Sequence, residues 1–227
     1  MSSDSRSPLV VTIDGPAASG KSSTSQMVAE ALGMRHLDSG MIYRTVTAAR
    51  LRIGGPPASW TEESVLAAAS RATVAPGAPG ATSFEPRLDG AECEAEIRGE
   101  AVTATVSLVA KMPRVRIWVN ALVRATAATH EIVVDGRDMG TAVFPDARLK
   151  VWLVASPAER ARRRVLQRTG REPTAAEVAF ETSELEARDL KDRQQTQPAT
   201  DAVWIDTTGI TQAEQVRRIV ELATAKR

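Results

Sequence analysis

The chain has 227 residues, enough for one α/β domain with a sizeable core and a small insert. Its 29 basic and 28 acidic residues give a formal net charge of +1, so overall charge favours neither nucleic acid nor a membrane as a partner. The single cysteine, Cys93, excludes an internal disulfide framework and fits a reducing compartment, so we expect a cytoplasmic protein.

The N-terminal residues predict a short tail, a strand and a helix. The segment MSSDSRSP (residues 1–8) lacks the apolar core of a signal peptide, and we expect it to fray. The β-branched run LVVTID (residues 9–14) is typical of a buried strand. Apolar residues recur at helical spacing from Met27 to Leu32, and Gly33 predicts the end of that helix.

Between this strand and this helix, GPAASGKS (residues 15–22) matches the phosphate-loop pattern G-x-x-x-x-G-K-[ST] at every position. Backbone N–H groups at a helix N-terminus attract anions, and the two glycines let the backbone approach a phosphate closely. Lys21 is expected to reach the β- and γ-phosphates, and the Ser22 hydroxyl to lie near Mg²⁺. The expected phosphate-binding residues are Gly15, Pro16, Ala17, Ala18, Ser19, Gly20, Lys21, Ser22 and Ser23. The alternative is a glycine turn before a capped helix.

Strand and helix signals alternate along the rest of the chain. Four further apolar runs predict strands at residues 34–38, 131–136, 148–156 and 201–208. Helical periodicity covers residues 117–128, 157–167, 175–192 and 212–223. This alternation predicts an α/β fold with a five-stranded parallel sheet and helices on both faces. Asp14, Asp38 and Asp135 end predicted strands, so we expect them to face one crevice beyond the sheet.

Residues 61–100 interrupt the alternation and predict a small inserted subdomain of one helix and a hairpin. Thr61 is a candidate N-cap before EESVLAAAS, and a loop rich in glycine and proline, APGAPGATS, follows. Asp89 and Gly90 stand between alternating runs, which is a strong hairpin signal. The alternative is that the insert is a surface decoration.

Three other motifs concentrate arginines and carboxylates near the predicted strand ends. They are LDSGMIYR (residues 37–44), SLVAKMPRVR (107–116, before a predicted helix) and DGRDMGTAVFPDA (135–147). This mixture suits a second phosphorylated ligand, although each residue alone could be a surface charge or a helix cap. His36 and His130 lie in no motif and are poor catalytic candidates.

At these motifs the sequence resembles the bacterial cytidylate kinases, which transfer the γ-phosphate of ATP to CMP or dCMP. The motifs IDGPAASGKSS, LDSGMIYR, SLVAKMPRVR, DGRDMGTAVFPDA, ERARRR and RDLKD occur in the family's order, so the resemblance covers nearly the whole chain. It implies one P-loop nucleotide kinase domain over residues 1–227, with ATP and CMP or dCMP as substrates and Mg²⁺ as cofactor. It also places the insert of about 61–100 on the CMP side.

The resemblance implies roles for individual residues. Ser39, Tyr43 and Arg44 would border the CMP site, Ser107, Arg116 and Asp138 would read cytosine, and Arg188 with Asp192 would engage the ribose. The implied substrate-binding set is Asp38, Ser39, Tyr43, Arg44, Ser107, Arg116, Asp135, Arg137, Asp138, Arg188 and Asp192. The implied catalytic set is Lys21, Arg137, Arg163 and Arg164, and Ser22 would hold Mg²⁺, with Asp135 acting through water. By spacing alone, Arg188 and Asp192 could instead form an ordinary i,i+4 ion pair.

Two segments keep alternatives open. ERARRR (residues 159–164) is either a solvated helix face or the start of a mobile lid, about residues 159–173, that closes over the transferring phosphate. The family usually has another arginine shortly after RDLKD, where this chain has Gln194 and Gln195. Arg193 or a lid arginine could replace that missing donor.

The expected chemistry is an in-line attack of a CMP phosphate oxygen on the γ-phosphorus, with no covalent intermediate. A related phosphotransferase acting on UMP or a non-nucleotide alcohol is one alternative. A regulatory nucleotide switch is another, but it would require an N-K-x-D segment, which the sequence lacks. The absence of a long apolar surface stripe favours a monomer.

Overall fold

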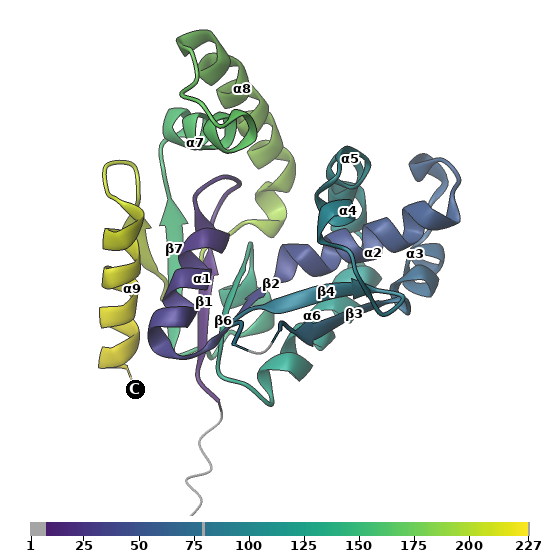
Figure 1. Ribbon diagram of the computed structural model, residues 1–227, viewed down its shortest axis with the longest axis horizontal. Helices are drawn as coiled ribbons and strands as arrows, with labels where there is room; N and C mark the ends of the chain where they lie inside the picture. Colours follow the sequence, from purple (N-terminus) through teal and green to yellow (C-terminus); the bar gives the residue numbers. More distant parts are fainter. Residues whose placement is uncertain (1–7, 79, 227) are drawn as a thin grey trace, which may run out of the picture. The chain divides into compact units, whose positions relative to one another are not determined.

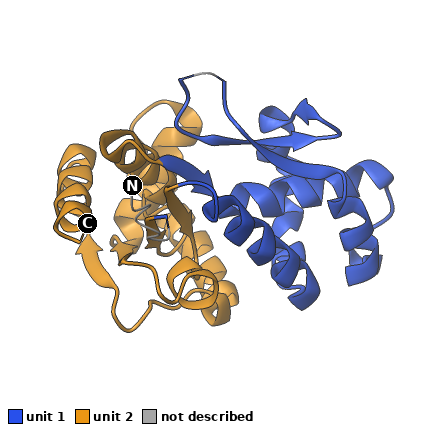
Figure 2. Ribbon diagram, turned by 90° about the horizontal axis from the view of Figure 1, so that it is seen from below, with its two compact units in different colours: residues 1–8, 35–130 blue, residues 9–34, 131–227 orange. Residues whose placement is uncertain are grey.

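The computed structural model describes residues 8–78 and 80–226 (Figure 1). The tail expected to fray at residues 1–7 lies outside this range. The chain divides into two compact units (Figure 2). The first contains Arg35–His130, and the second contains Leu9–Met34 and Glu131–Arg227. No helix of the described residues is long and apolar enough to cross a membrane.

The central element is a five-stranded sheet with the strand order β2-β6-β1-β7-β8. Its strands are β1 (Val10–Asp14), β2 (Arg35–Asp38), β6 (Ile132–Gly136), β7 (Leu149–Val154) and β8 (Val203–Asp206). Strand β1 pairs in parallel with β6 and β7, and β7 pairs in parallel with β8. All five strands fall within the runs predicted from sequence, so the parallel α/β prediction is confirmed.

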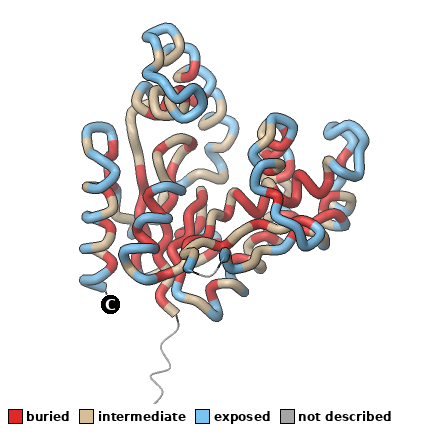
Figure 3. The backbone as a smooth tube through the Cα atoms, viewed as in Figure 1, coloured by how far each residue is buried: buried red, intermediate tan, exposed pale blue. Residues whose placement is uncertain are grey.

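The core of the second unit lies on one face of its strands, beneath α1 (Lys21–Leu32) and α9 (Gln212–Ala225). Strand side chains alternate in direction, which places Val11 and Ile13 of β1 in this core. Both are fully buried, and Figure 3 shows the buried interior against the exposed outer surface of α9. Gly33 ends α1 in the left-handed conformation, with φ of 67°, which confirms the predicted stop.

Helices α7 (Pro157–Thr169) and α8 (Ala175–Asp192) pack against each other in the second unit, as Figure 1 shows. Ser156 caps the N-terminus of α7, and Thr174 forms a capping box with Glu177 at the start of α8. Both helices therefore begin at the residues predicted from sequence. Two short elements complete the unit, a π-helix η2 (Met139–Val143) and a 3-10 helix η3 (Arg193–Gln195).

The described residues of the first unit form five α-helices and a small antiparallel sheet. The helices are α2 (Ser39–Ile53), α3 (Glu62–Ala69), α4 (Glu94–Arg98), α5 (Glu100–Val109) and α6 (Pro113–Ala127), and a 3-10 helix η1 (Pro57–Ser59) precedes α3. Thr61 caps α3 as predicted. The helix predicted at 117–128 instead begins at Pro113, because proline is well suited to a first helical turn. Residues 107–116 therefore do not simply precede a helix: they span the end of α5 and the start of α6.

The small sheet has the order β3-β4-β5, formed by β3 (Ala72–Pro76), β4 (Phe84–Leu88) and β5 (Ala91–Glu92). Asp89 and Gly90 form its turn with φ of 55° and 80°, which confirms the predicted hairpin. The loop predicted from residue 75 is shorter than expected, because residues 72–76 pair with β4 as a third strand. The assignment of residues 61–100 to the substrate side stays a prediction.

Candidate active site

The phosphate loop connects β1 to α1 in the second unit. A Cβ on Gly15 would lie 2.2 Å from the backbone oxygen of Leu153, so the loop passes against β7 where only glycine fits. Gly20 adopts φ of 90° and caps α1, whose N-terminal N–H groups make an anion-binding end. The Lys21 ammonium donates to the backbone oxygen of Pro16 at 2.6 Å. The loop therefore curls around the lysine that is expected to contact phosphate.

Two side-chain oxygen groups suited to a metal ion lie at the start of α1 and near the end of β6, on Ser22 and Asp135. The Ser22 hydroxyl donates to a carboxylate oxygen of Asp135 at 2.7 Å, and Asp135 is 2% exposed. No cluster of three or more metal-binding side chains occurs in residues 8–78 and 80–226. Mg²⁺ takes few protein oxygens and completes its octahedral shell with phosphates and water, so this pair fits that ion.

Asp14, at the end of β1, fixes the segment that follows β6. Its buried carboxylate accepts hydrogen bonds from the backbone N–H groups of Met139 at 2.9 Å and Gly140 at 2.8 Å. A Cβ on Gly140 would lie 2.9 Å from the Thr12 hydroxyl, so η2 packs closely on the sheet. Burial raises the pKa of Asp14 to about 6, although the two N–H groups oppose that rise. The sequence placed Asp14 at a strand end but gave no sign of this partner.

We expect Asp14→Asn to flatten the pH dependence of stability between pH 4 and 6. The pKa of Asp14 is raised from 3.8, so the folded state keeps a proton that the unfolded state has already lost. Wild-type stability should therefore fall as pH rises through this window, by about 3 kcal/mol if the full shift applies. Urea unfolding of wild type and variant at several pH values measures this pH dependence of the free energy of unfolding. Parallel curves for wild type and variant would contradict the assignment.

Arginines and aspartates gather where β6 and α8 end. Arg137, directly after β6, lies 3.2 Å from Asp192 of α8, and Arg188 lies 3.7 Å from the same carboxylate. Nη1 of Arg137 and Nε of Arg188 are shielded from solvent and make no hydrogen bond. Burial lowers the pKa of Arg137, and Asp192 opposes this effect. Buried N–H donors without acceptors are costly, so this cluster is suited to an anionic ligand.

A second pair joins this cluster to the phosphate loop. Arg160 of α7 is 5% exposed, and it donates to Asp189 of α8 at 2.6 Å and to the backbone oxygen of Ala17 at 3.2 Å. A solvated helix face therefore does not describe this residue of ERARRR. Sequence reasoning missed Asp189 entirely, because one carboxylate in the acidic and basic pattern of α8 carries no distinguishing signal.

Arg163 and Arg164 of α7, which belong to the implied catalytic set, have separate partners. Arg163 bonds to Glu159 of its own helix and to Thr207 after β8, and its Nη1 atom lies 3.7 Å from where a Gly20 Cβ would stand. Arg164 pairs at 2.9 Å with Glu181 of α8. Arg163 thus lies beside the phosphate loop, whereas Arg164 contributes to the packing of α7 on α8.

The first unit holds the remaining substrate-side candidates. Asp38 accepts a hydrogen bond from the N–H of Met41 and so caps α2. The Arg116 guanidinium of α6 lies over the ring of buried Tyr43, with 5.9 Å from Cζ to the ring centroid. Arg44 donates to the backbone oxygen of Ile97 and to Thr103. Ser39 begins α2, Ser107 lies on α5, and Asp138 directly precedes η2 in the second unit.

The strand order places β1, and with it the phosphate loop, in the middle of a parallel sheet, with arginines and aspartates after neighbouring strands. This combination defines a P-loop kinase. A solved structure of an uncharacterized protein from Eubacterium ventriosum matches with a TM-score of 0.54 at 10% identity, covering 96% of this chain and 99% of its own. At that identity it supports the fold alone.

Comparison with known protein sequences identifies one family within the P-loop kinases. The family model described as cytidylate kinase matches residues 11–225. A cytidylate kinase of Streptomyces griseus subsp. griseus is 42% identical, covering 98% of this chain and 95% of its own. A cytidylate kinase of Chlorobaculum tepidum is 38% identical, covering 96% and 93%. The chain belongs to the cytidylate kinase family.

Proposed function

We propose that this protein transfers the γ-phosphate of ATP to CMP or dCMP, giving ADP and CDP or dCDP, in pyrimidine nucleotide metabolism. The observation that carries this proposal is the pairing, within one compact unit, of a phosphate loop with a buried arginine cluster. Nη1 of Arg137 is shielded and makes no hydrogen bond, and Nε of Arg188 is shielded with the Asp192 carboxylate 3.7 Å away, too far for a hydrogen bond. One anion site binds the donor, and the second suits a phosphorylated acceptor. Family membership supports the identity of both substrates.

The residues divide between donor and acceptor. The phosphate loop, residues 15–23, binds the ATP phosphates, and Ser22 with Asp135 would hold Mg²⁺. When bound, this ion neutralises charge on the phosphate oxygens. For the acceptor, Arg44 and Arg137 bind the CMP phosphate, and Arg188 with Asp192 binds the ribose. Ser107, Arg116 and Asp138 read the base, while Ser39 and Tyr43 border it.

The reaction needs positioning and charge stabilisation rather than a covalent intermediate. A CMP phosphate oxygen, already anionic near neutral pH, forms a bond to the γ-phosphorus while the bond to the ADP oxygen breaks. Lys21 stabilises charge between the β- and γ-phosphates, and Arg137, Arg163 and Arg164 act on the transferring group. Residues 159–173 serve as a lid that excludes water, and residues 61–100 complete the CMP side. The protein works as a cytoplasmic monomer.

An assay of ADP release with CMP, dCMP, UMP and AMP as acceptors tests the proposal. We expect fast turnover with CMP or dCMP and much slower turnover with AMP. A preference for UMP, or for a non-nucleotide alcohol in a wider panel, would favour a different phosphotransferase on this fold. If ADP release is too slow for a metabolic enzyme whichever acceptor is added, the result would favour a nucleotide switch.

Asp138→Ala should narrow the preference for CMP over UMP. A carboxylate can accept a hydrogen bond from the exocyclic amine of cytosine and repels the carbonyl oxygen of uracil at the same position. A contact of this kind is worth about 1–3 kcal/mol of discrimination, so the ratio of kcat/KM values should fall about 5- to 150-fold. Measuring kcat/KM for both substrates checks this result. If both values fall equally, Asp138 only braces its neighbours and does not read the base.

A further inference from the structure

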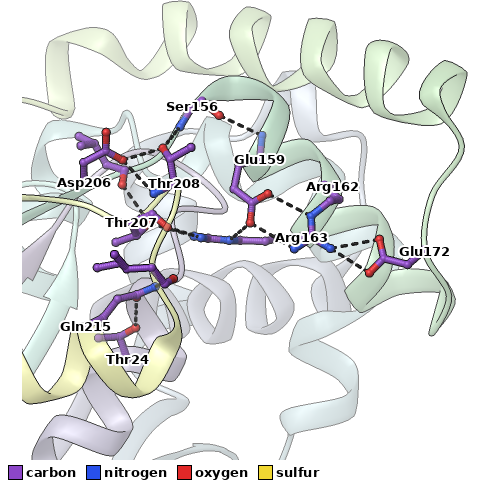
Figure 4. Close-up of polar contacts among 12 residues, drawn as sticks. Thr24, Ser156, Glu159, Arg162, Arg163, Glu172, Asp206, Thr207, Thr208 and Gln215 are labelled. Carbon is purple, nitrogen blue, oxygen red and sulfur yellow. Dashed lines mark hydrogen bonds and ion pairs between the residues drawn. The ribbon is translucent and has the colours of Figure 1, made fainter.

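Arg163 is held in place by three hydrogen bonds on two sides of its guanidinium. Its Nε donates to Glu159 at 2.7 Å, while Nη1 and Nη2 donate to the hydroxyl at 2.9 Å and the backbone oxygen at 2.6 Å of Thr207. Figure 4 shows the guanidinium between these two residues. An arginine side chain is flexible, so fixing all of its nitrogens removes most of that freedom.

Both partners are themselves fixed. The Thr207 side chain is fully buried, and its hydroxyl donates to the backbone oxygen of Val154 at 2.9 Å, which leaves a lone pair for Arg163. Glu159 lies in the first turn of α7 and also accepts hydrogen bonds from Arg162. Hydrogen bonds from Arg162, and then from Arg163, lower the pKa of Glu159, so it is ionised at neutral pH. Thr207, directly after β8, and the first turn of α7 together orient one guanidinium.

We propose, on the basis of the function given above, that Glu159 and Thr207 are positioning residues that hold Arg163 beside the phosphate loop for phosphoryl transfer. The Arg163 Nη1 atom lies 3.7 Å from the Cβ position of Gly20, at the N-terminus of α1 where phosphate oxygens bind. Preorganised positive charge at that place stabilises the transition state without reorganisation during the reaction. Glu159 and Thr207 touch no substrate and act through Arg163.

The chain offers matched controls for this role. Glu214, in the first turn of α9, accepts hydrogen bonds from Arg217 and Arg218 in the way that Glu159 accepts from Arg162 and Arg163, and it belongs to no part of the proposed site. Glu159→Gln should lower kcat about tenfold with little change in KM for CMP, whereas Glu214→Gln should leave kcat within about twofold. Thr207→Val should resemble Glu159→Gln. Thr207→Ser keeps the hydroxyl and should restore turnover.

Coupling to Arg163 separates positioning from general stability. In an Arg163→Ala background, which itself lowers kcat, Glu159→Gln and Thr207→Val should each change kcat less than twofold further. Thermal unfolding of every variant shows whether the fold persists. If Arg163→Ala is impaired but Glu159→Gln behaves like Glu214→Gln, the positioning role is wrong while the proposed function stands. If wild type does not phosphorylate CMP, the proposed function itself fails.

Discussion

Lys21→Ala should give a folded protein whose kcat is lower by at least about two orders of magnitude. The lysine is the first residue of α1 and lies outside the apolar core, so its loss costs little stability. In the proposed function its ammonium is the loop's charged contact with the β- and γ-phosphates, and losing such a contact removes about 3 kcal/mol or more of transition-state stabilisation.

Steady-state kinetics with saturating CMP, together with circular dichroism, measures both parts of this expectation. Lys111→Ala is the control, because Lys111 is an exposed lysine in the first unit and should leave kcat unchanged. Turnover at the wild-type rate in a soluble Lys21→Ala variant would remove the phosphate-loop assignment.

Gly15→Ala should abolish activity and also destabilise the protein. The new Cβ would lie 2.2 Å from the backbone oxygen of Leu153, at φ of 154°, and neither the loop nor β7 can move without breaking packed structure. Overpacking of this kind costs about 1–3 kcal/mol, which corresponds to a fall in Tm of about 2–12 °C for a chain of this size. A displaced loop cannot align its N–H groups with phosphate, so kcat should fall at least about a hundredfold.

Gly209→Ala is the matched control, because nothing lies within 4 Å of the position that its Cβ would take and it lacks a left-handed φ. Scanning calorimetry and the ADP-release assay should find this variant close to wild type. A Gly15→Ala variant with wild-type Tm and kcat would show that the loop adapts and that the close approach to Leu153 is not required.

Local signals predicted most of the secondary structure. Helix α8 has the predicted bounds, because Thr174 and Glu177 form a capping box and the apolar spacing is regular. Strand β3 was not predicted, because Pro76 and the following glycines are typical of a loop and its pairing partner lies further along the chain. Short strands depend on such pairing more than on their own residues.

The sequence by itself determined the phosphate loop, the five parallel strands, the bounds of α8 and the family, because these depend on residue type and on short-range spacing. Only the tertiary structure decided the distant partners of three of the four arginines of ERARRR. Arg160 reaches Asp189, Arg163 reaches Thr207 and Arg164 reaches Glu181, all on later elements. Likewise, the Asp14 carboxylate accepts hydrogen bonds from Met139 and Gly140, which lie 125 and 126 positions further along the chain. Helical spacing determines which side chains share a face of one helix. Their partners on distant elements depend on burial and hydrogen bonding, which arise only when the chain is packed.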